Sequence, residues 1–160
     1  MTPPPGYETD RVVRLEVNLD DLSPEVTGAN FEALLAAGAL DVWLTPIQMK
    51  KNRPGTMLSV LCEEAQMPAL ADLIFRETTT FGIRIEHVMR LKLERRFEQV
   101  ATEFGEVTVK LGLRAGEVIQ RAPEFESCKA VARASGVPLR AVYEAAQRAA
   151  FERMCRGGSL

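Results

Sequence analysis

The spacing of hydrophobic residues switches several times between strand and helix patterns along the first hundred positions. The order of these patterns constrains the fold more than any other feature of this chain. Apolar and polar residues alternate from Val13 to Asp20, which is the pattern of a strand covered on one side. Helical spacing follows between Ser23-Pro24, a helix start signal, and Gly38, a stop signal. The elements predicted in this way are, in order, a strand from Arg11, a helix at 24–37, strands at 40–49 and 56–62 around the turn KKNRPG, a helix at 65–78 and a long strand from Ile83 to Phe97.

This succession of strand, helix, strand, strand, helix and strand predicts a fold of the α+β class. Two right-handed split βαβ units in this order form an antiparallel four-stranded sheet with both helices on one face. We therefore predict a ferredoxin-like βαββαβ domain at residues 11–90. The last strand exceeds the usual length of ~3 to 10 residues, so we expect it to bend near Arg90 and continue into a second domain.

Residues 91–156 predict that smaller domain, a β-hairpin followed by two helices. The hairpin turns at Phe104-Gly105, and helical spacing returns at 124–135 and 138–155. The first ten residues contain three consecutive prolines and a glycine, a composition that neither pairs as a strand nor continues a helix. Residues 1–10 are therefore expected to form a flexible leader.

Composition excludes several classes of protein. The chain has 160 residues, 46% of them hydrophobic and 26% charged, with a net charge of -2, which excludes a disordered acidic tail and a broadly basic nucleic-acid coat. It has no apolar run near the ~18 residues of a membrane-spanning helix and no signal peptide, so we expect a cytosolic protein without a membrane partner. Cys62, Cys128, Cys155 and the single histidine, His87, form no zinc or redox motif, so a bound metal must use oxygen ligands or a partner molecule.

The predicted topology brings three polar segments to one end of the sheet. They are the exit of the first strand, the hairpin turn, and the connection between the second helix and the last strand. Together they carry two acids, up to five cations and three hydroxyl groups. The candidate site residues are Asp20 and Asp21 in the first segment, Lys50, Lys51 and Arg53 in the second, and Arg76, Thr78, Thr79, Thr80 and Arg84 in the third.

Such a set of side chains suits a polyphosphate that carries a divalent ion. Ammonium and guanidinium groups neutralise phosphate oxygens, hydroxyls and loop amides donate hydrogen bonds to them, and carboxylates hold a hard cation. The predicted ligand is a Mg-nucleotide, although the chain has neither a P-loop nor a dinucleotide fingerprint. Each segment taken alone is also typical of a solvated turn or a helix start, so the prediction depends on their convergence.

Four blocks of sequence resemble a known family. They are LEVNLDDLSPE, GALDVWLTPIQMKKNRPGTMLSVLC, IFRETTTFGIR and GVPLRAVYE, and they span roughly residues 15–145. They are similar to the C-terminal portion of the LarC family of nickel-insertion proteins. The resemblance implies a CTP-dependent cyclometallase of the lyase class, which inserts nickel into pyridinium-3,5-bisthiocarboxylic acid mononucleotide during maturation of the nickel-pincer cofactor of lactate racemase.

The same resemblance implies that this part of the protein binds CTP with Mg or Mn, while nickel is the inserted metal. Applied to this sequence, it leads us to expect phosphate contacts from Lys50, Lys51 and Arg53, with Lys51 and Arg53 as the catalytic cations. The divalent ion would bind to Asp20 or Asp21. The remaining residues expected to line the same pocket are Arg76, Thr78, Thr79, Thr80 and Arg84. Complete family members have a long N-terminal portion, which we expect as a partner. We also expect the exposed edge of the long strand and hairpin to support a homo-oligomer, a trimer or hexamer.

Two other functions stay open at this stage. One is a nucleotide-sensing regulatory protein without catalysis. The other is a helix-turn-helix DNA-binding module, because Ala132, Gly136 and Val142 have the spacing of such units. Residues 121–160 contain seven Lys or Arg against four Glu, a balance of only +3, and simple packing of two helices explains the same spacing, so we do not expect a nucleic-acid partner.

Three further residues receive interpretations of their own. We expect His87 to be a hydrogen-bonded, half-buried histidine and Cys62 to belong to the core. Among the aromatic residues, Phe81 is the one in a predicted site loop, where it is a candidate for stacking on a pyrimidine.

Overall fold

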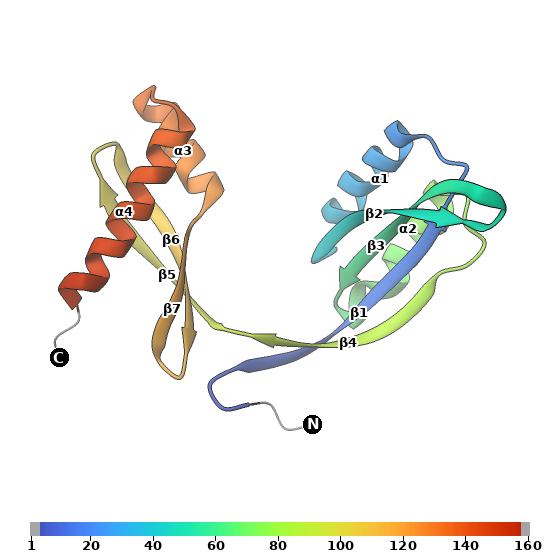
Figure 1. The fold of residues 1–160 in the computed structure, drawn as a ribbon, viewed down its shortest axis with the longest axis horizontal. Coiled ribbons are helices and arrows are strands. Elements are labelled where there is room, and N and C mark those ends of the chain that lie inside the picture. Colours follow the sequence, from blue (N-terminus) through green and yellow to red (C-terminus); the bar gives the residue numbers. More distant parts are fainter. Residues whose placement is uncertain (1–3, 158–160) are drawn as a thin grey trace. The chain divides into compact units, whose positions relative to one another are not determined.

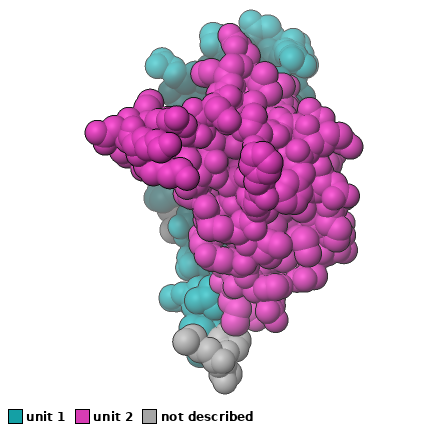
Figure 2. All heavy atoms as spheres, turned by 90° about the vertical axis from the view of Figure 1, so that its right-hand side faces the viewer, with its two compact units in different colours: residues 1–8, 91–160 teal, residues 9–90 magenta. Residues whose placement is uncertain are grey.

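The computed structural model describes residues 4–157, with side chains described as far as Glu152. The chain divides into two compact units, residues 9–90 (unit 2) and the remainder (unit 1), which Figure 2 distinguishes by colour. Each unit has a separate hydrophobic core. The two boundaries fall between Glu8 and Thr9 and between Arg90 and Leu91.

Unit 2 has the predicted ferredoxin-like order of elements, which confirms the predicted α+β class (Figure 1). The strands form one sheet in the order β2-β3-β1-β4, in which β3 pairs antiparallel with both β1 and β2. The elements are β1 (Glu8–Leu19), α1 (Pro24–Ala36), β2 (Asp41–Met49), β3 (Arg53–Cys62), α2 (Met67–Glu77) and β4 (Arg84–Lys92). Short 3-10 turns at Lys50–Asn52 and Glu64–Gln66 precede β3 and α2.

The core of unit 2 follows from the alternation in β1. Four apolar residues from Val13 to Leu19 are buried on one face, where they pack with Leu34 of α1 and with Leu70 and Ile74 of α2. Helix α1 begins as the sequence predicts, because the Ser23 hydroxyl accepts a hydrogen bond from the Val26 amide at 3.4 Å. Both helices therefore cover the face of the sheet that carries the apolar half of β1.

The expected flexible leader is wrong for residues 8–10, because β1 begins at Glu8. The reason is a contact with a residue far along the chain. Arg90 donates two hydrogen bonds to the Asp10 carboxylate, at 2.9 and 2.7 Å, which joins the start of β1 to β4. This hydrogen bonding raises the pKa of the Arg90 guanidinium. Residues 1–3 of the expected leader lie outside the described residues.

The long strand predicted from Ile83 to Phe97 is two strands. The first, β4, ends at Lys92, and β5 (Glu94–Thr102) belongs to the second sheet. The break therefore falls at Leu93, three residues beyond the predicted bend. Apolar residues at odd positions of this stretch, such as Met89 and Phe97, are each 61% exposed. The alternation correctly indicates extended structure here, but it does not indicate burial.

Unit 1 contains a three-stranded sheet and two helices. The order is β5-β6-β7, with antiparallel pairs throughout, and the helices pack on this sheet. The remaining elements are β6 (Gly105–Arg114), β7 (Glu117–Pro123), α3 (Phe125–Ser135) and α4 (Leu139–Gly157). The predicted hairpin is the β5–β6 pair, and β7 extends it by a strand that the sequence analysis did not include.

The two helices of unit 1 form a core with the sheet. Ala132 is 8% exposed, Val142 is fully buried, and Gly136 ends α3 in the left-handed conformation with φ 69°. These are the residues that matched a helix-turn-helix spacing. Ala132 and Val142 are buried between the helices and the sheet, whereas Gly136 is an exposed helix end, and both observations agree with the packing explanation. Among the described residues, none of the helices is long and apolar enough to cross a membrane.

Candidate functional site

Hydrogen bonds and ion pairs link the three polar segments at one end of the unit 2 sheet. We call these segments, residues 18–21, 50–55 and 76–84, the rim (Figure 1). Arg53 Nη1 lies 3.2 Å from Asp20 Oδ2, which joins the hairpin turn to the exit of β1. The Thr79 hydroxyl donates a hydrogen bond to Asp21 Oδ1, which joins the connection after α2 to the same exit. The two adjacent aspartates therefore hold the other two segments in place.

The hairpin turn is built with a strained backbone. Lys51 has φ 60° and ψ 27°, and Asn52 has φ 56°, so both occupy the left-handed region. Asparagine tolerates this region, whereas lysine adopts it at a cost of roughly 1–2 kcal/mol. Such strain is concentrated at functional sites. Lys50, Lys51 and Arg53 are all exposed, so their charges face solvent at the rim.

Three threonine hydroxyls order the connection between α2 and β4. Thr78 Oγ1 donates to the Ile74 carbonyl at 2.7 Å and caps the end of α2. Thr80 Oγ1 donates to the Gly82 carbonyl at 2.9 Å, and Thr79 reaches Asp21. The threonine side chains therefore shape this loop first, so any hydrogen bond to a phosphate has to replace one of these contacts or come from the loop amides.

One buried residue that sequence reasoning missed fixes the position of this loop. Asn30 of α1 is 5% exposed, and its Nδ2 donates to the Glu77 carbonyl at the last residue of α2, over 2.8 Å. The sequence does contain a signal for this residue. Asn30 has helical spacing to Thr27 and Leu34, so a polar side chain falls on the buried face of α1. The amide consequently anchors the helix end from which the third rim segment departs.

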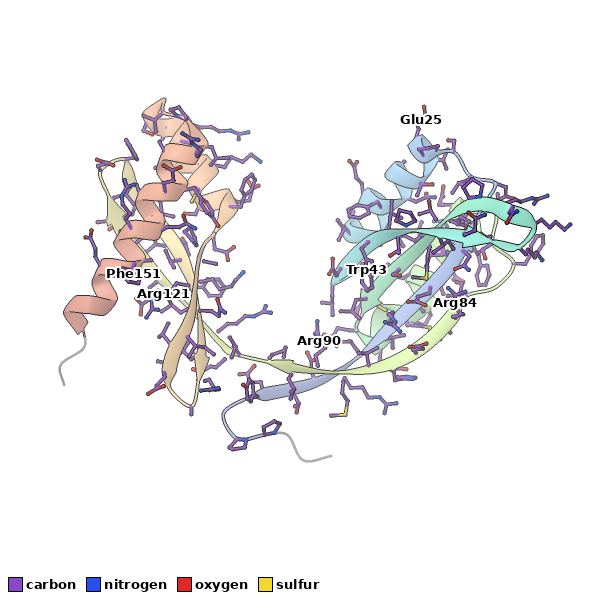
Figure 3. The ribbon with its side chains drawn as sticks, viewed as in Figure 1. Glu25, Trp43, Arg84, Arg90, Arg121 and Phe151 are labelled. Atoms are coloured by element: carbon purple, nitrogen blue, oxygen red, sulfur yellow. The ribbon has the colours of Figure 1, made fainter. Side chains whose placement is uncertain are left out.

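Arg84 occupies a different environment from the one that the sequence suggested. It is the first residue of β4, and Figure 3 labels it. Its Nη2 donates to Asn18 Oδ1 at 2.7 Å, and its Nε lies 3.5 Å from Glu16 Oε2. Arg14 extends this set of charges, with Nη2 2.6 Å from Glu86 Oε2. Arg14, Glu16 and Asn18 alternate with the buried residues of β1, so they lie on the opposite face of the sheet. There they meet Arg84 and Glu86 of β4. Arg84 thus carries charge to the rim but is already paired along β1.

Arg76 lies in the last turn of α2, where its Nε is 3.2 Å from the Glu77 carboxylate and its side chain is 69% exposed. Its ion pair is thus with a neighbour on its own helix. Direct contacts between rim segments join Arg53 to Asp20, Thr79 to Asp21 and Arg84 to Asn18. Lys50, Lys51 and Arg76 belong to the rim because of their positions in the hairpin turn and at the end of α2.

The carboxylates suit a divalent ion that a nucleotide also coordinates. Among the described residues there is no group of three or more His, Cys, Asp and Glu side chains that could hold a metal alone. Mg²⁺ is usually bound through one or two carboxylates together with phosphate oxygens and water. Asp20 and Asp21 supply this number of carboxylates, and their oxygen chemistry fits Mg²⁺ or Mn²⁺.

The histidine and the described cysteines lie apart from the rim contacts. His87 Nε2 is 3.0 Å from Glu64 Oε2, as expected for a hydrogen-bonded histidine, but the residue is exposed rather than half-buried. Cys62 and Cys128 are fully buried free thiols, and burial raises the pKa of each. The Cys155 side chain lies outside the described residues.

The fold is that of an α+β protein with a cluster of charged and hydroxyl side chains at one end of a ferredoxin-like sheet. A family model described as nickel insertion protein matches residues 2–143. The chain therefore belongs to the nickel insertion protein family, which confirms the resemblance found in the sequence.

Relatives with established names support this assignment. The pyridinium-3,5-bisthiocarboxylic acid mononucleotide nickel insertion protein of Clostridium acetobutylicum is 47% identical over 131 residues, which cover 82% of this chain and 31% of that protein. The protein of the same name from Acetivibrio thermocellus is 45% identical over 140 residues, 88% of this chain and 34% of that protein. The chain thus spans about one third of the length of the relatives that it matches.

A solved structure is similar over nearly its whole length. It is the apo form of LarC2, the C-terminal domain of a cyclometallase involved in the synthesis of the NPN cofactor of lactate racemase. The identity is 41% and the TM-score 0.82, and the alignment covers 89% of this chain and 99% of that one. This similarity extends to the fold of both units, because it includes most of the described residues.

Proposed function

We propose that this chain is the C-terminal, CTP-binding part of a nickel-inserting cyclometallase. The activity places nickel into pyridinium-3,5-bisthiocarboxylic acid mononucleotide, with hydrolysis of CTP, and the N-terminal part of the family protein is the partner. Membership of the nickel insertion family and similarity to a cyclometallase domain support the reaction. The main support for nucleotide binding is the pair of aspartates, which joins the hairpin turn to the connection between α2 and β4. We call this connection, residues 78–82, the threonine loop.

The rim provides both halves of a site for a nucleotide and its divalent ion. Asp20 and Asp21 would hold Mg or Mn, which would neutralise charge on the phosphates. Lys50, Lys51 and Arg53 would contact the phosphate oxygens from the hairpin turn, and Arg76 from the end of α2. The ion pair between Arg53 and Asp20 keeps these opposite charges next to each other, so neither is left uncompensated before the ligand arrives.

Lys51 and Arg53 are the proposed catalytic cations. Nucleotide hydrolysis develops negative charge on the leaving phosphate, and cations that are already in place stabilise it. The strained backbone at Lys51 is consistent with a side chain whose position matters for function. Nickel is the substrate metal, and the product has one Ni–C and two Ni–S bonds. We assign no nickel ligand to this chain.

Calorimetric titration with CTP, ATP and GTP, each with Mg²⁺, tests this proposal. We expect CTP to bind best, and Lys51→Ala to weaken CTP binding by about 1.5 to 3 kcal/mol, the usual contribution of a hydrogen bond to a charged group. Lys129→Ala is the matched control, because Lys129 pairs with Glu126 on α3, in the other unit. Equal binding of the three nucleotides without hydrolysis would favour a regulatory nucleotide sensor, and unchanged CTP affinity in Lys51→Ala would refute the phosphate assignment.

We also propose that the chain forms a homo-oligomer, a trimer or hexamer, in the cytosol. Strand β4 lies at an edge of the four-stranded sheet, where Ile85 is 49% and Met89 61% exposed. Light scattering of the wild type and of Ile85→Lys tests this: the variant should have a lower mass. Val26→Lys, at a 43% exposed position on α1, is the control and should keep the wild-type mass. A monomeric wild type would contradict the proposal.

A further inference from the structure

Phe81 is the most exposed large hydrophobic residue among those that the structure describes. Its exposure is 104%, whereas the next most exposed, Met89, Phe97 and Phe151, reach 61%. An aromatic ring normally buries much of its area, because this is where its favourable contribution to folding arises. Phe81 therefore contributes nothing to the core of unit 2, and its presence in the rim calls for a role outside the fold.

The backbone that carries Phe81 is held on both sides by hydrogen bonds. Thr80 Oγ1 donates to the Gly82 carbonyl at 2.9 Å and accepts from the Gly82 amide at 3.4 Å, so the hydroxyl spans the residue between them. The Thr80 amide in turn donates to Thr78 Oγ1 at 3.3 Å. Phe81 is thus presented on an ordered turn, which reduces the entropy lost when its ring binds a ligand.

The turn lies within reach of the carboxylates of the proposed site. Thr79, two residues before Phe81, donates its hydroxyl hydrogen to Asp21. Two residues of chain span at most about 7 Å, so the ring projects from the immediate neighbourhood of the proposed phosphate and metal contacts. When the phosphates of a nucleotide bind at the rim, its base also needs a binding surface. The ring of Phe81 offers an aromatic surface for that base.

A nucleotide accounts for the surroundings of Phe81 better than an apolar protein partner does. The side chains of Arg53 and Arg76 are 58% and 69% exposed on the same rim. A partner that covered Phe81 with an apolar surface would also remove these guanidinium groups and the carboxylates paired with them from water, and the desolvation of an ion pair is costly. A nucleotide combines an aromatic ring with an anionic tail, so it satisfies both kinds of group.

We propose that Phe81 stacks on the base of the nucleotide whose phosphates bind at the rim. This inference rests on the proposed function and extends it to the recognition of the base. Stacking tolerates any base, because every base has a π-face. Phe81 therefore raises the affinity for pyrimidine and purine nucleotides alike, and the preference for CTP comes from other residues.

Comparing CTP with inorganic tripolyphosphate, which has no base, isolates this contribution. Both are titrated with Mg²⁺ against the full chain as wild type, Phe81→Ala and Phe81→Trp. We expect Phe81→Ala to weaken CTP binding about 5- to 150-fold and to leave tripolyphosphate binding unchanged. Phe81→Trp keeps CTP affinity within a few fold. Phe151→Ala, an exposed aromatic position on α4 in the other unit, is the control and should bind both ligands as the wild type does.

Each contrary result overturns a defined statement. Equal CTP affinity in Phe81→Ala and the wild type overturns the stacking, whereas an equal loss for CTP and tripolyphosphate shows that the ring acts on the phosphate site. A lower oligomeric mass of Phe81→Ala with unchanged CTP affinity assigns the ring to a contact between copies. If the wild type binds neither ligand, the proposed function fails as well; if its CTP affinity depends on Lys51 but not on Phe81, only this inference fails.

Fluorescence provides a direct readout of the ring position. The chain has one tryptophan, Trp43, so Trp43→Phe combined with Phe81→Trp leaves a single tryptophan at the rim. A stacked base changes the emission of that tryptophan, and tripolyphosphate does not. The same response to both ligands would overturn the proposal.

Discussion

Arg53 Nη1 lies 3.2 Å from Asp20 Oδ2, although the two residues are 33 positions apart in the chain. The contact joins the first residue of β3 to the residue that follows β1. The Asp20 side chain is 19% exposed and the Arg53 side chain 58%, so the carboxylate is the more protected partner. This arrangement leaves the guanidinium accessible to an anion and keeps the carboxylate beside it.

The first prediction concerns the carboxylates. Asp20→Asn removes a charge that we assign to the divalent ion, so binding of CTP with Mg²⁺ should weaken about tenfold or more, while binding of CTP in EDTA should stay equal or improve. Calorimetry under both conditions measures this. Asp72→Asn, at an exposed position of α2, is the control. If Mg²⁺ raises the CTP affinity of Asp20→Asn as much as that of the wild type, Asp20 does not hold the ion.

The second prediction concerns the close approach of β3 to the end of β1. A Cβ atom at Gly55 would lie 2.9 Å from the Leu19 carbonyl oxygen and 2.6 Å from Met49 Sδ. The methionine side chain can move, but the backbone oxygen is held by the sheet. Gly55→Ala should therefore separate the strands at the rim, with a loss of about 1–3 kcal/mol in the free energy of unfolding and weaker CTP binding.

Gly28 provides a matched control for this substitution. It lies inside α1, and a Cβ atom there would have nothing within 4 Å. Gly28→Ala should raise the free energy of unfolding by about 0.5–1 kcal/mol, because alanine favours the helix. Urea denaturation of both variants measures the two effects. A Gly55→Ala protein as stable as the wild type would show that the strands relax without cost.

The third prediction concerns Asn30, which anchors the end of α2. Asn30→Ala leaves the Glu77 carbonyl without its partner, so the free energy of unfolding should fall by about 1–3 kcal/mol. CTP binding should weaken as well, because the threonine loop begins at that helix end. Glu32→Ala, at an exposed position of the same helix, should stay within about 0.5 kcal/mol of the wild type. Equal stability of Asn30→Ala and Glu32→Ala would contradict this role.

The fold of unit 2 could be predicted because its signals are local. The alternation from Val13 to Leu19, the cap at Ser23 and the stop at Gly38 each act over a few residues. Strand β7 could not be found in this way, because its sequence EVIQRAP lacks alternation and ends in proline. Its pairing with β6 also includes a register shift between Gly112 and Leu113. That strand depends on its neighbour rather than on its own pattern.

The rim could be predicted in outline because topology alone brings strand ends and turns together. Its internal pairing could not, because the partners are far apart in the sequence. Arg84 pairs with Asn18 across 66 positions, and Asn30 reaches Glu77 across 47. The start of β1 depends in the same way on the contact between Asp10 and Arg90. Composition shows which charges are available, but only the packed sheet decides which of them meet.

The last prediction concerns the buried thiols. Cys62 and Cys128 are fully buried, and burial raises the pKa of both above the value in the unfolded chain, which is about 8.5. The unfolded state therefore loses its thiol protons at a lower pH than the folded state does. The contribution of the protonated thiols to the free energy of unfolding is fully present below the pKa of the unfolded chain. It is lost as the pH rises through the raised pKa values of the folded protein.

Urea denaturation at pH 7.5 and at pH 9.5 measures this effect. The free energy of unfolding of the wild type should fall more between these two pH values than that of the double variant Cys62→Ala, Cys128→Ala. The double variant loses packing and is less stable at both pH values, but its stability should depend less on pH, because both shifted groups are gone. Since all other titrating groups are shared, the same decrease in the two proteins would mean that the buried thiols do not contribute.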